Sequence, residues 1–153
     1  MRRMILAAAA LAVLVSGCAT DEFQQTKAQV AQSIAAEQPG DYYIGRRFYR
    51  RYYFFWGYVR GPRQPWSSAQ LVMLNEQKVL APDRQANAMG YDNNTEYRLD
   101  GYFSGQTVYE PASNAFYPEF ILTGYKEIST NPPRIFRDQK ATDPNRLVID
   151  KPE

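Results

Sequence analysis

Residues 42–60 read YYIGRRFYRRYYFFWGYVR, an unusually aromatic segment. Half of the chain's 12 Tyr, 8 Phe and 2 Trp residues lie between Tyr42 and Trp66. Aromatic residues are enriched in strands because they pack well on a pleated, half-buried surface. The segment therefore predicts two strands, Tyr42–Tyr49 and Tyr53–Arg60. Their alternation is poor, because aromatic side chains fall on both faces.

The residues that follow predict further strands separated by turns. Gly61–Pro65 contains one Gly and two Pro, which predicts a turn, so Trp66–Asn75 is expected to form a hairpin with the strand before it. Glu96–Ser104 alternates cleanly between polar and apolar residues, and Gly101 within it predicts a bulge or bend. The remaining elements are a polar loop at residues 81–95 and strands at residues 107–110 and 120–128.

These strands predict a mainly β domain at residues 41–128. We expect a small antiparallel barrel of five or six strands, OB-like or SH3-like, preceded by one N-terminal helix. An antiparallel β-sandwich is the alternative.

The segments that flank the β domain have different compositions. Thr20–Gln38 predicts a helix in which Phe23, Val30 and Ile34 form a narrow apolar stripe. We expect residues 18–40 to be a helical tether that docks loosely on the domain. Residues 129–153 are Pro-rich and charged, and predict an extended tail with little core of its own.

The N-terminus has the three parts of an export signal. Arg2 and Arg3 precede the apolar run Ile5–Val15, which leads into Val15-Ser16-Gly17-Cys18. The run is shorter than the roughly 20 residues that a bilayer-spanning helix needs. This segment resembles the lipobox of bacterial lipoproteins, where signal peptidase II cuts before a cysteine that carries lipid.

The resemblance implies that residues 1–17 are a signal peptide and that cleavage after Gly17 leaves an acylated Cys18. Several acyl chains anchor a protein firmly, since each buried methylene contributes about 0.8 kcal/mol. Ala19 follows the cysteine where the enterobacterial sorting pattern for inner-membrane retention has Asp. The resemblance therefore implies the outer membrane, facing the periplasm or the surface. An ordinary secretory signal with an incidental cysteine is the alternative.

Composition narrows the possible chemistry. The full chain carries a formal charge of +2, and loss of Arg2 and Arg3 makes the remainder formally neutral, so we expect no nucleic-acid partner. The chain has no His and one Cys, which excludes Ser-His-Asp and Cys-His catalysis and the common zinc sites. We expect no cofactor, no metal and no enzymatic activity.

Arginines interleave with the aromatic residues and form the candidate binding surface. Arg makes paired hydrogen bonds to phosphate and carboxylate groups, which envelope lipids and polymers carry, and exposed aromatic rings can stack on sugars. The alternatives are a solvated strand surface on which Arg stacks on Tyr, and Trp residues that belong to the core. The candidate residues are Arg46, Arg47, Arg50, Arg51, Trp56, Tyr58, Arg60, Arg63 and Trp66.

Acidic residues offer two further interpretations. Two of Asp100, Glu110 and Glu119 could hydrolyse glycosides if they lay about 5–9 Å apart. Asp92–Glu96 faintly resembles an acidic calcium loop, as a calcium-dependent adhesin would need, but an Asx-rich turn is favoured.

The sequence therefore predicts a membrane-anchored lipoprotein with a non-enzymatic binding or structural β module. Its expected partners are the membrane, through the anchor, and an envelope protein or polymer. The alternative function is a carboxylate-dependent glycan-acting enzyme of the periplasm.

Overall fold

The computed structural model describes residues 17–153, with side chains from Glu22 onward. The expected signal peptide, apart from Gly17, lies outside the described residues. No helix in this part of the chain has the length and apolarity to cross a membrane. The elements are α1 (Gly17–Ala36), β1 (Tyr43–Arg47), β2 (Gly57–Arg60), a 3₁₀ turn (Trp66–Ser68), β3 (Gln70–Asn75), α2 (Pro82–Gln85), β4 (Glu96–Glu110), β5 (Ala115–Ser129) and a second 3₁₀ turn (Gln139–Thr142).

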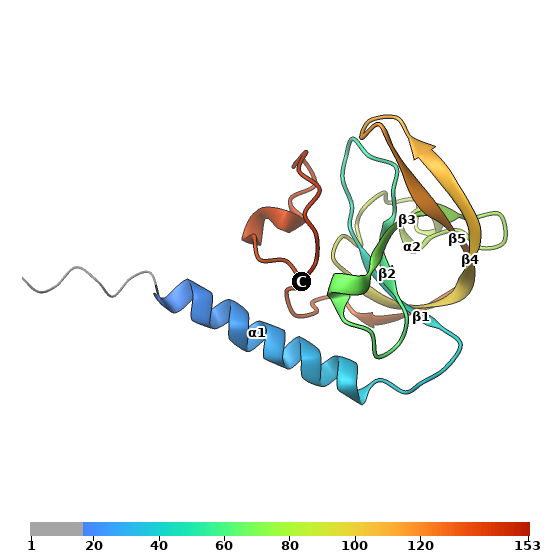
Figure 1. The fold of residues 1–153 in the computed structure, drawn as a ribbon. Coiled ribbons are helices and arrows are strands. Elements are labelled where there is room, and N and C mark those ends of the chain that lie inside the picture. The colour runs from blue at the N-terminus through green and yellow to red at the C-terminus, as the bar shows by residue number, and fades with distance from the viewer. Residues whose placement is uncertain (1–16) are drawn as a thin grey trace, which may run out of the picture.

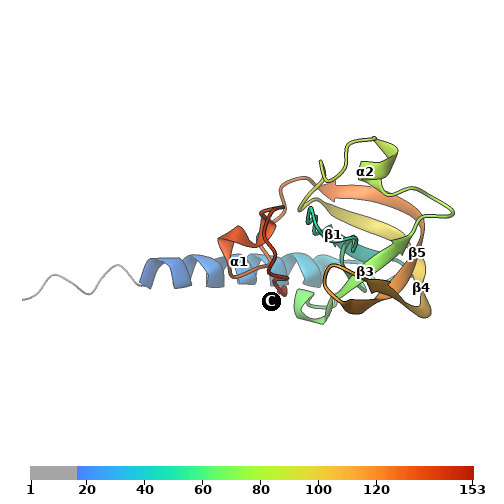
Figure 2. The ribbon, with the colours of Figure 1, turned by 90° about the horizontal axis from the view of Figure 1, so that it is seen from above.

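The five strands close into a small barrel in the order β1-β2-β3-β5-β4, and β4 returns to pair with β1 (Figure 1). This confirms the predicted barrel with one preceding helix and excludes the sandwich. β3 and β5 run parallel, whereas the other neighbours are antiparallel. Insertion of β5 between β3 and β4 is a Greek-key arrangement, as in the OB-like alternative. The connection that contains α2 lies over one end of the barrel (Figure 2).

β1 and β2 are shorter than the predicted strands. The predicted hairpin of β2 and β3 is confirmed, because Tyr58 pairs with Leu71. Four of the five residues of β1, Ile44–Arg47, are buried. A strand that is covered on both faces loses the alternation of polar and apolar residues. The poor alternation of the segment therefore reflects a strand with the barrel interior on one face and other parts of the chain on the other.

β4 unites two predicted strands into one strand of 15 residues. The predicted alternation is confirmed, because Tyr97 and Leu99 are buried in the barrel and Arg98 is exposed. The predicted irregularity at Gly101 is also present as a shift in the register between β4 and β5. Gly101 has φ +155°, and a Cβ there would overlap the carbonyl oxygen of Ile121. Only glycine fits the backbone at this bend.

The buried side chains form two clusters. One fills the barrel interior and includes Trp56, Val72, Leu99, Phe120 and Leu122. The other joins side chains of β1, β2 and the loops around them to residues that follow β5; it contains Ile44, Phe48, Phe55, Tyr58, Trp66, Leu71, Ile135, Phe136 and Ala141.

Residues 132–153, here called the C-terminal segment, complete this second cluster. Ile135, Phe136 and Ala141 are each at most 2% exposed. The segment has one 3₁₀ turn and no strand, as an extended tail would, and its buried residues belong to a core that it shares with the barrel. Leu147 and Val148 in the same segment are exposed.

α1 lies along the C-terminal segment and extends beyond the barrel (Figures 1 and 2). Its apolar stripe is the predicted one, because Phe23 is buried and Val30 and Ile34 pack against the second cluster. The Phe23 ring lies 5.0 Å from the guanidinium of Arg134 and 5.9 Å from that of Arg137. The helix is therefore held along its length, which corrects the expectation of a loosely docked tether.

Candidate functional site

The structure buries most of the predicted binding surface. Arg46, Arg47, Arg50 and Arg60 are each at most 5% exposed, and so are Trp56, Tyr58 and Trp66. Only Arg51 and Arg63 are exposed. Seven of the nine candidates therefore cannot meet a partner from solution, and the prediction is wrong for them. The reason is that each buried arginine has an acidic or carbonyl partner elsewhere in the chain.

Arg60 joins the barrel to α1. Its two terminal nitrogens donate to the carboxylate of Glu37 at 2.9 and 2.6 Å, just beyond the end of the helix. Glu37 also accepts from the backbone N–H of Arg63 at 2.7 Å. The guanidinium of Arg60 stacks over Trp66, 4.5 Å from the ring centroid. A bidentate pair of this kind fixes orientation as well as position, so the helix has a defined direction relative to the barrel.

Arg47 joins β1 to the connection that contains α2. It donates to Asp83 at 2.8 Å, and its Nε lies 3.6 Å from the carboxylate of Asp92. It also donates to the backbone carbonyl of Trp56. Burial raises the pKa of Asp92, and the positive charge of Arg47 opposes that effect. Arg47 thus neutralises two acids that are each 1% exposed.

Arg46 and Arg50 join the barrel to the C-terminal segment. Arg46 pairs with Glu96 on β4 and donates to the carbonyl of Pro133 at 3.1 Å. Burial lowers its pKa despite the favourable charge of Glu96. These contacts need a permanent cation, which arginine supplies and lysine in a buried site does not.

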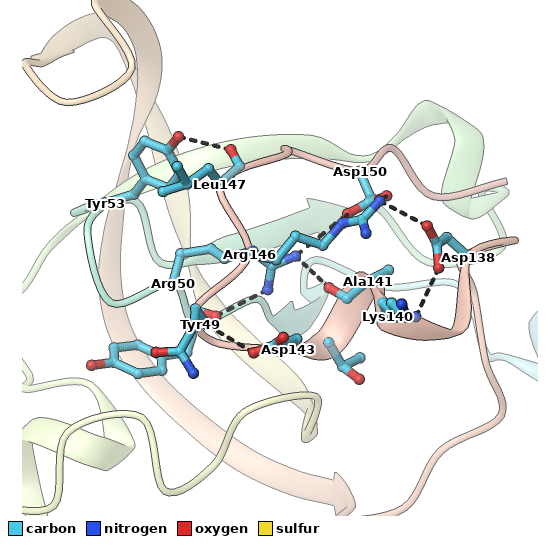
Figure 3. A network of polar contacts seen from close by, with 12 residues as sticks. Tyr49, Arg50, Tyr53, Asp138, Lys140, Ala141, Asp143, Arg146, Leu147 and Asp150 are labelled. Carbon is cyan, nitrogen blue, oxygen red and sulfur yellow. Dashed lines mark hydrogen bonds and ion pairs between the residues drawn. The ribbon is translucent and has the colours of Figure 1, made fainter.

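Figure 3 shows that the side chain of Arg50 enters the fold of the C-terminal segment. It donates to the carbonyls of Tyr49 and Ala141, and it lies 3.6 Å from the carboxylate of Asp150. Asp150 in turn accepts from Arg146 at 2.9 Å. Each of the four buried arginines thus connects β1, β2 or the loop between them to a distant segment, which explains why they lie close together in the sequence.

The two tryptophans and Tyr58 belong to the packed interior, as the core alternative predicted for the Trp residues. Trp56 lies in the barrel cluster, and Trp66 lies between the guanidinium groups of Arg46 and Arg60. Tyr58 donates through its hydroxyl to the backbone carbonyl of Asp150 at 2.7 Å. Burial raises the pKa of Tyr58, so this hydroxyl stays protonated as a structural donor.

Four side chains of Asp92–Glu96 accept hydrogen bonds from other parts of the protein. Asp92 accepts from the hydroxyl of Tyr97 at 3.0 Å, and Asn93 accepts from the backbone of Tyr49 at 3.0 Å. Asn94 has φ +68°, the left-handed conformation common in Asx turns. In the described residues, no three acidic or Cys side chains form a group that could hold a metal ion. The stretch is a structural loop.

The structure separates two of the three candidate carboxylates, and the third, Glu119 on β5, accepts a hydrogen bond from the side chain of Asn75 at 2.9 Å. Asp100 and Glu110 are ten positions apart along β4, and Glu110 is fully buried, whereas the side chain of Asp100 is 55% exposed. Burial favours a raised pKa for Glu110, but hydrogen bonds from Ser113, Ala112 and Phe54 outweigh it and hold the pKa below its usual value. A carboxylate held ionised in this way is not suited to general-acid catalysis.

Six of the eleven large exposed aromatic or aliphatic side chains in the described residues lie on three loops at one end of the barrel. We call this surface the loop end: the β1–β2 loop (residues 48–56), the tip of the β4–β5 hairpin (residues 107–118) and residues 143–148. Tyr53 donates to the carbonyl of Leu147 at 2.8 Å, and the backbone N–H of Arg51 donates to the carbonyl of Pro144 at 2.9 Å. The large exposed residues of the loop end are Tyr52, Phe54, Tyr109, Phe116, Leu147 and Val148.

Glu110 connects the first two of these loops. Its carboxylate accepts from the backbone N–H of Phe54 at 3.4 Å and from that of Ser113 at 2.6 Å. The rings of Phe55 and Tyr117 also meet, with their centroids 5.6 Å apart. Because both loops share a buried carboxylate and an aromatic contact, Phe54 and the hairpin tip keep a fixed relation to each other.

A pocket of about 230 Å³ opens beside Phe54, between the β1–β2 loop and α2. Its lining includes Glu76, Asp83, Arg84 and Met89. Sites for small ligands are typically about 300–1,000 Å³, so this pocket is small for that purpose. The loop end therefore suits contact with an extended surface better than capture of a small molecule.

Sequence reasoning missed most of the loop end. Tyr52 and Phe54 lie within the aromatic segment but were placed in or beside a strand. Tyr109 and Phe116 flank a turn without charged residues, Pro111-Ala112-Ser113-Asn114. A turn tip that carries aromatic residues and no charge is a signal that the side chains meet something other than water.

The chain was compared with protein-family models, with curated proteins and with solved structures. No family model, no curated protein and no solved structure matches it.

Proposed function

We propose that this protein is a lipid-anchored lipoprotein of the bacterial cell envelope, with a barrel that serves as a non-enzymatic binding or structural module. The observation that carries the proposal is the position of Cys18. It closes the lipobox-like sequence, and it falls in the first turn of α1, a helix that Arg60 and the C-terminal segment hold against the barrel.

The helix suits the role of a rigid arm. α1 has 20 residues, which corresponds to a length of about 30 Å at 1.5 Å per residue. An acyl group on Cys18 would place the start of this arm at the membrane surface, and the arm would fix where the barrel lies relative to that surface. A flexible linker of the same length would not fix this position.

Ala19 after the cysteine favours the outer membrane over the inner membrane, with the barrel facing the periplasm or the surface. The partner-binding role falls to the loop end, because the arginines of the aromatic segment are occupied by internal partners. Its exposed aromatic side chains supply large apolar contact areas with few rotatable bonds. An envelope component is therefore the expected partner of this surface.

Acylation is tested by expressing the full chain with an alkyne analogue of palmitate and measuring label and membrane retention. The wild-type chain should be labelled and recovered with the membranes, whereas Cys18→Ala should be unlabelled and should retain its signal sequence. Ser33→Ala, on an exposed face of α1, is the matched control and should behave as wild type. Label that persists in Cys18→Ala would refute the anchor, and so would a wild-type chain without label.

A further inference from the structure

The loop end exposes six large aromatic or aliphatic side chains, and it lies on the same side of the molecule as the start of α1 (Figure 1). We infer that the loop end is a lipid-contacting surface, which seats the barrel against the bilayer that holds the acylated Cys18. The inference rests on the proposed anchor and names the partner of the loop end as phospholipid.

The first support is the arrangement in space. In Figure 1 the start of α1, the tip of the C-terminal segment and the tips of the β1–β2 loop and the β4–β5 hairpin follow the upper left side of the molecule. The barrel and α2 lie behind them. One flat surface can therefore touch the anchor and the three loops together.

The second support is rigidity. Glu37 binds Arg60 just beyond the C-terminal end of α1, and at the middle of the helix Lys27 lies 3.3 Å from Glu153. Within the loop end, the hydroxyl of Tyr53 donates a hydrogen bond to the carbonyl of Leu147. The carboxylate of Glu110 accepts hydrogen bonds from both the β1–β2 loop and the hairpin turn. Since both parts are fixed to one body, anchoring the helix also brings the loop end to a defined distance from the membrane.

The third support is chemical. Phe54 is 73% exposed and Phe116 67% exposed, and no charged residue lies between Tyr52 and Val59 or between Pro111 and Pro118. The exposed charges of the loop end, Arg51 and Asp143, have opposite signs, and Arg146, whose side chain is 23% exposed, is paired with Asp138 and Asp150. Tyr and Phe with few charges suit the interfacial layer of a bilayer, where one end of the ring is apolar and the other is wet.

The energetic role follows from the limits of lipid anchors. A single acyl chain gives only marginal attachment, and stable attachment takes a second signal. Further acyl chains can supply that signal, but they leave the orientation of the barrel undefined. Contacts from the loop end would add affinity and would also select one orientation.

The test uses single Trp reporters on the full-length acylated protein in vesicles of phosphatidylethanolamine and phosphatidylglycerol, with or without brominated acyl chains. The reporters are Phe54→Trp and Phe116→Trp. The control is Tyr91→Trp, because Tyr91 is 59% exposed on the connection between α2 and β4. The native Trp56 and Trp66 are buried and supply a constant background. We expect bromolipid to quench both reporters at least twofold and to leave the control unchanged.

The outcomes separate the two proposals. If the protein stays on the vesicles but bromolipid does not quench the fluorescence of either reporter, the inference is refuted and the anchor is not. Equal quenching of Tyr91→Trp also refutes it, because the contact would then be unspecific. If bromolipid does not quench the reporters but peptidoglycan fragments shift their emission, the inference is refuted and the loop end binds a polymer instead. A protein that carries no acyl group and is not retained on vesicles refutes the proposed function.

Discussion

Replacing Arg47 by Met removes the cation that neutralises two buried acids, and the barrel should lose much of its stability. Asp83 and Asp92 are each 1% exposed, so without Arg47 their charges face a poorly solvated interior. The Met side chain has a similar length and fills most of the space. The loss of stability should therefore arise from the uncompensated charges of the two acids rather than from a cavity.

The magnitude follows from the partners that remain. Removing one partner of a buried ion pair typically costs about 3–5 kcal/mol. Asp83 keeps the backbone N–H groups of Arg84 and Gly90, each at 3.0 Å, and Asp92 keeps the Tyr97 hydroxyl. These donors place the expected loss near the lower limit, at about 3 kcal/mol. With an m-value of about 1–3 kcal/mol/M in urea, the unfolding midpoint should fall by about 1 M or more.

Urea unfolding followed by tryptophan fluorescence is the assay, because Trp56 and Trp66 are buried and change environment on unfolding. The matched control is Arg51→Met, since Arg51 is exposed and its backbone alone makes a hydrogen bond within the protein. A surface substitution of this kind should stay within about 0.5 kcal/mol of wild type. Arg47→Lys keeps the positive charge, so its stability should lie between those of Arg47→Met and Arg51→Met.

The pH dependence provides a second readout. Burial raises the pKa of Asp92 above its unfolded value, and loss of Arg47 should raise this pKa further. A group with a raised folded pKa contributes stability that is present at low pH and is lost as pH rises through the folded pKa. The deficit of Arg47→Met relative to wild type should therefore be smaller at pH 4 than at pH 7. Equal stability of Arg47→Met and Arg51→Met, or a deficit that grows as the pH falls, would refute the reasoning.

Three further predictions follow from single contacts. Glu37→Gln should weaken the pair with Arg60, lower stability by roughly 1.5–3 kcal/mol, and speed amide exchange in α1 while exchange in β4 stays slow. Gly101→Ala should destabilise the barrel in thermal unfolding because the new Cβ overlaps a strand carbonyl, whereas Gly105→Ala, with open space around it, should lose only the cost of its positive φ. Glu110→Gln should be less stable than wild type at pH 7, and the difference should shrink as pH falls through the depressed pKa of Glu110; a difference that grows as the pH falls would contradict this.

The sequence predicted the barrel because short-range patterns carry that information. The alternation around Tyr97 and Leu99, the glycine at the bend and the turn before Trp66 each concern neighbouring residues. The parallel pairing of β3 with β5 depends on the path of a long connection, and no local pattern reports it. The apolar stripe of α1 could likewise be predicted from the sequence, whereas the surface on which it packs could not.

The arginines were placed on the surface because their partners are remote in the sequence. Arg60 pairs with Glu37 and Arg50 with Asp150, and such pairings cannot be deduced from one strand. One observation did point to burial. The poor alternation of residues 42–60 is what a strand covered on both faces would show, and the arginines on such a strand must bring counter-charges with them.

The contact between α1 and the C-terminal segment has a consequence for the order of folding. Lys27 and Glu153 are 126 positions apart, and Arg50 and Ala141 are 91 positions apart. Contacts of such separation close long loops, which costs entropy and slows their formation. We therefore expect α1 to acquire its direction relative to the barrel late in folding, when the C-terminal segment has packed on both.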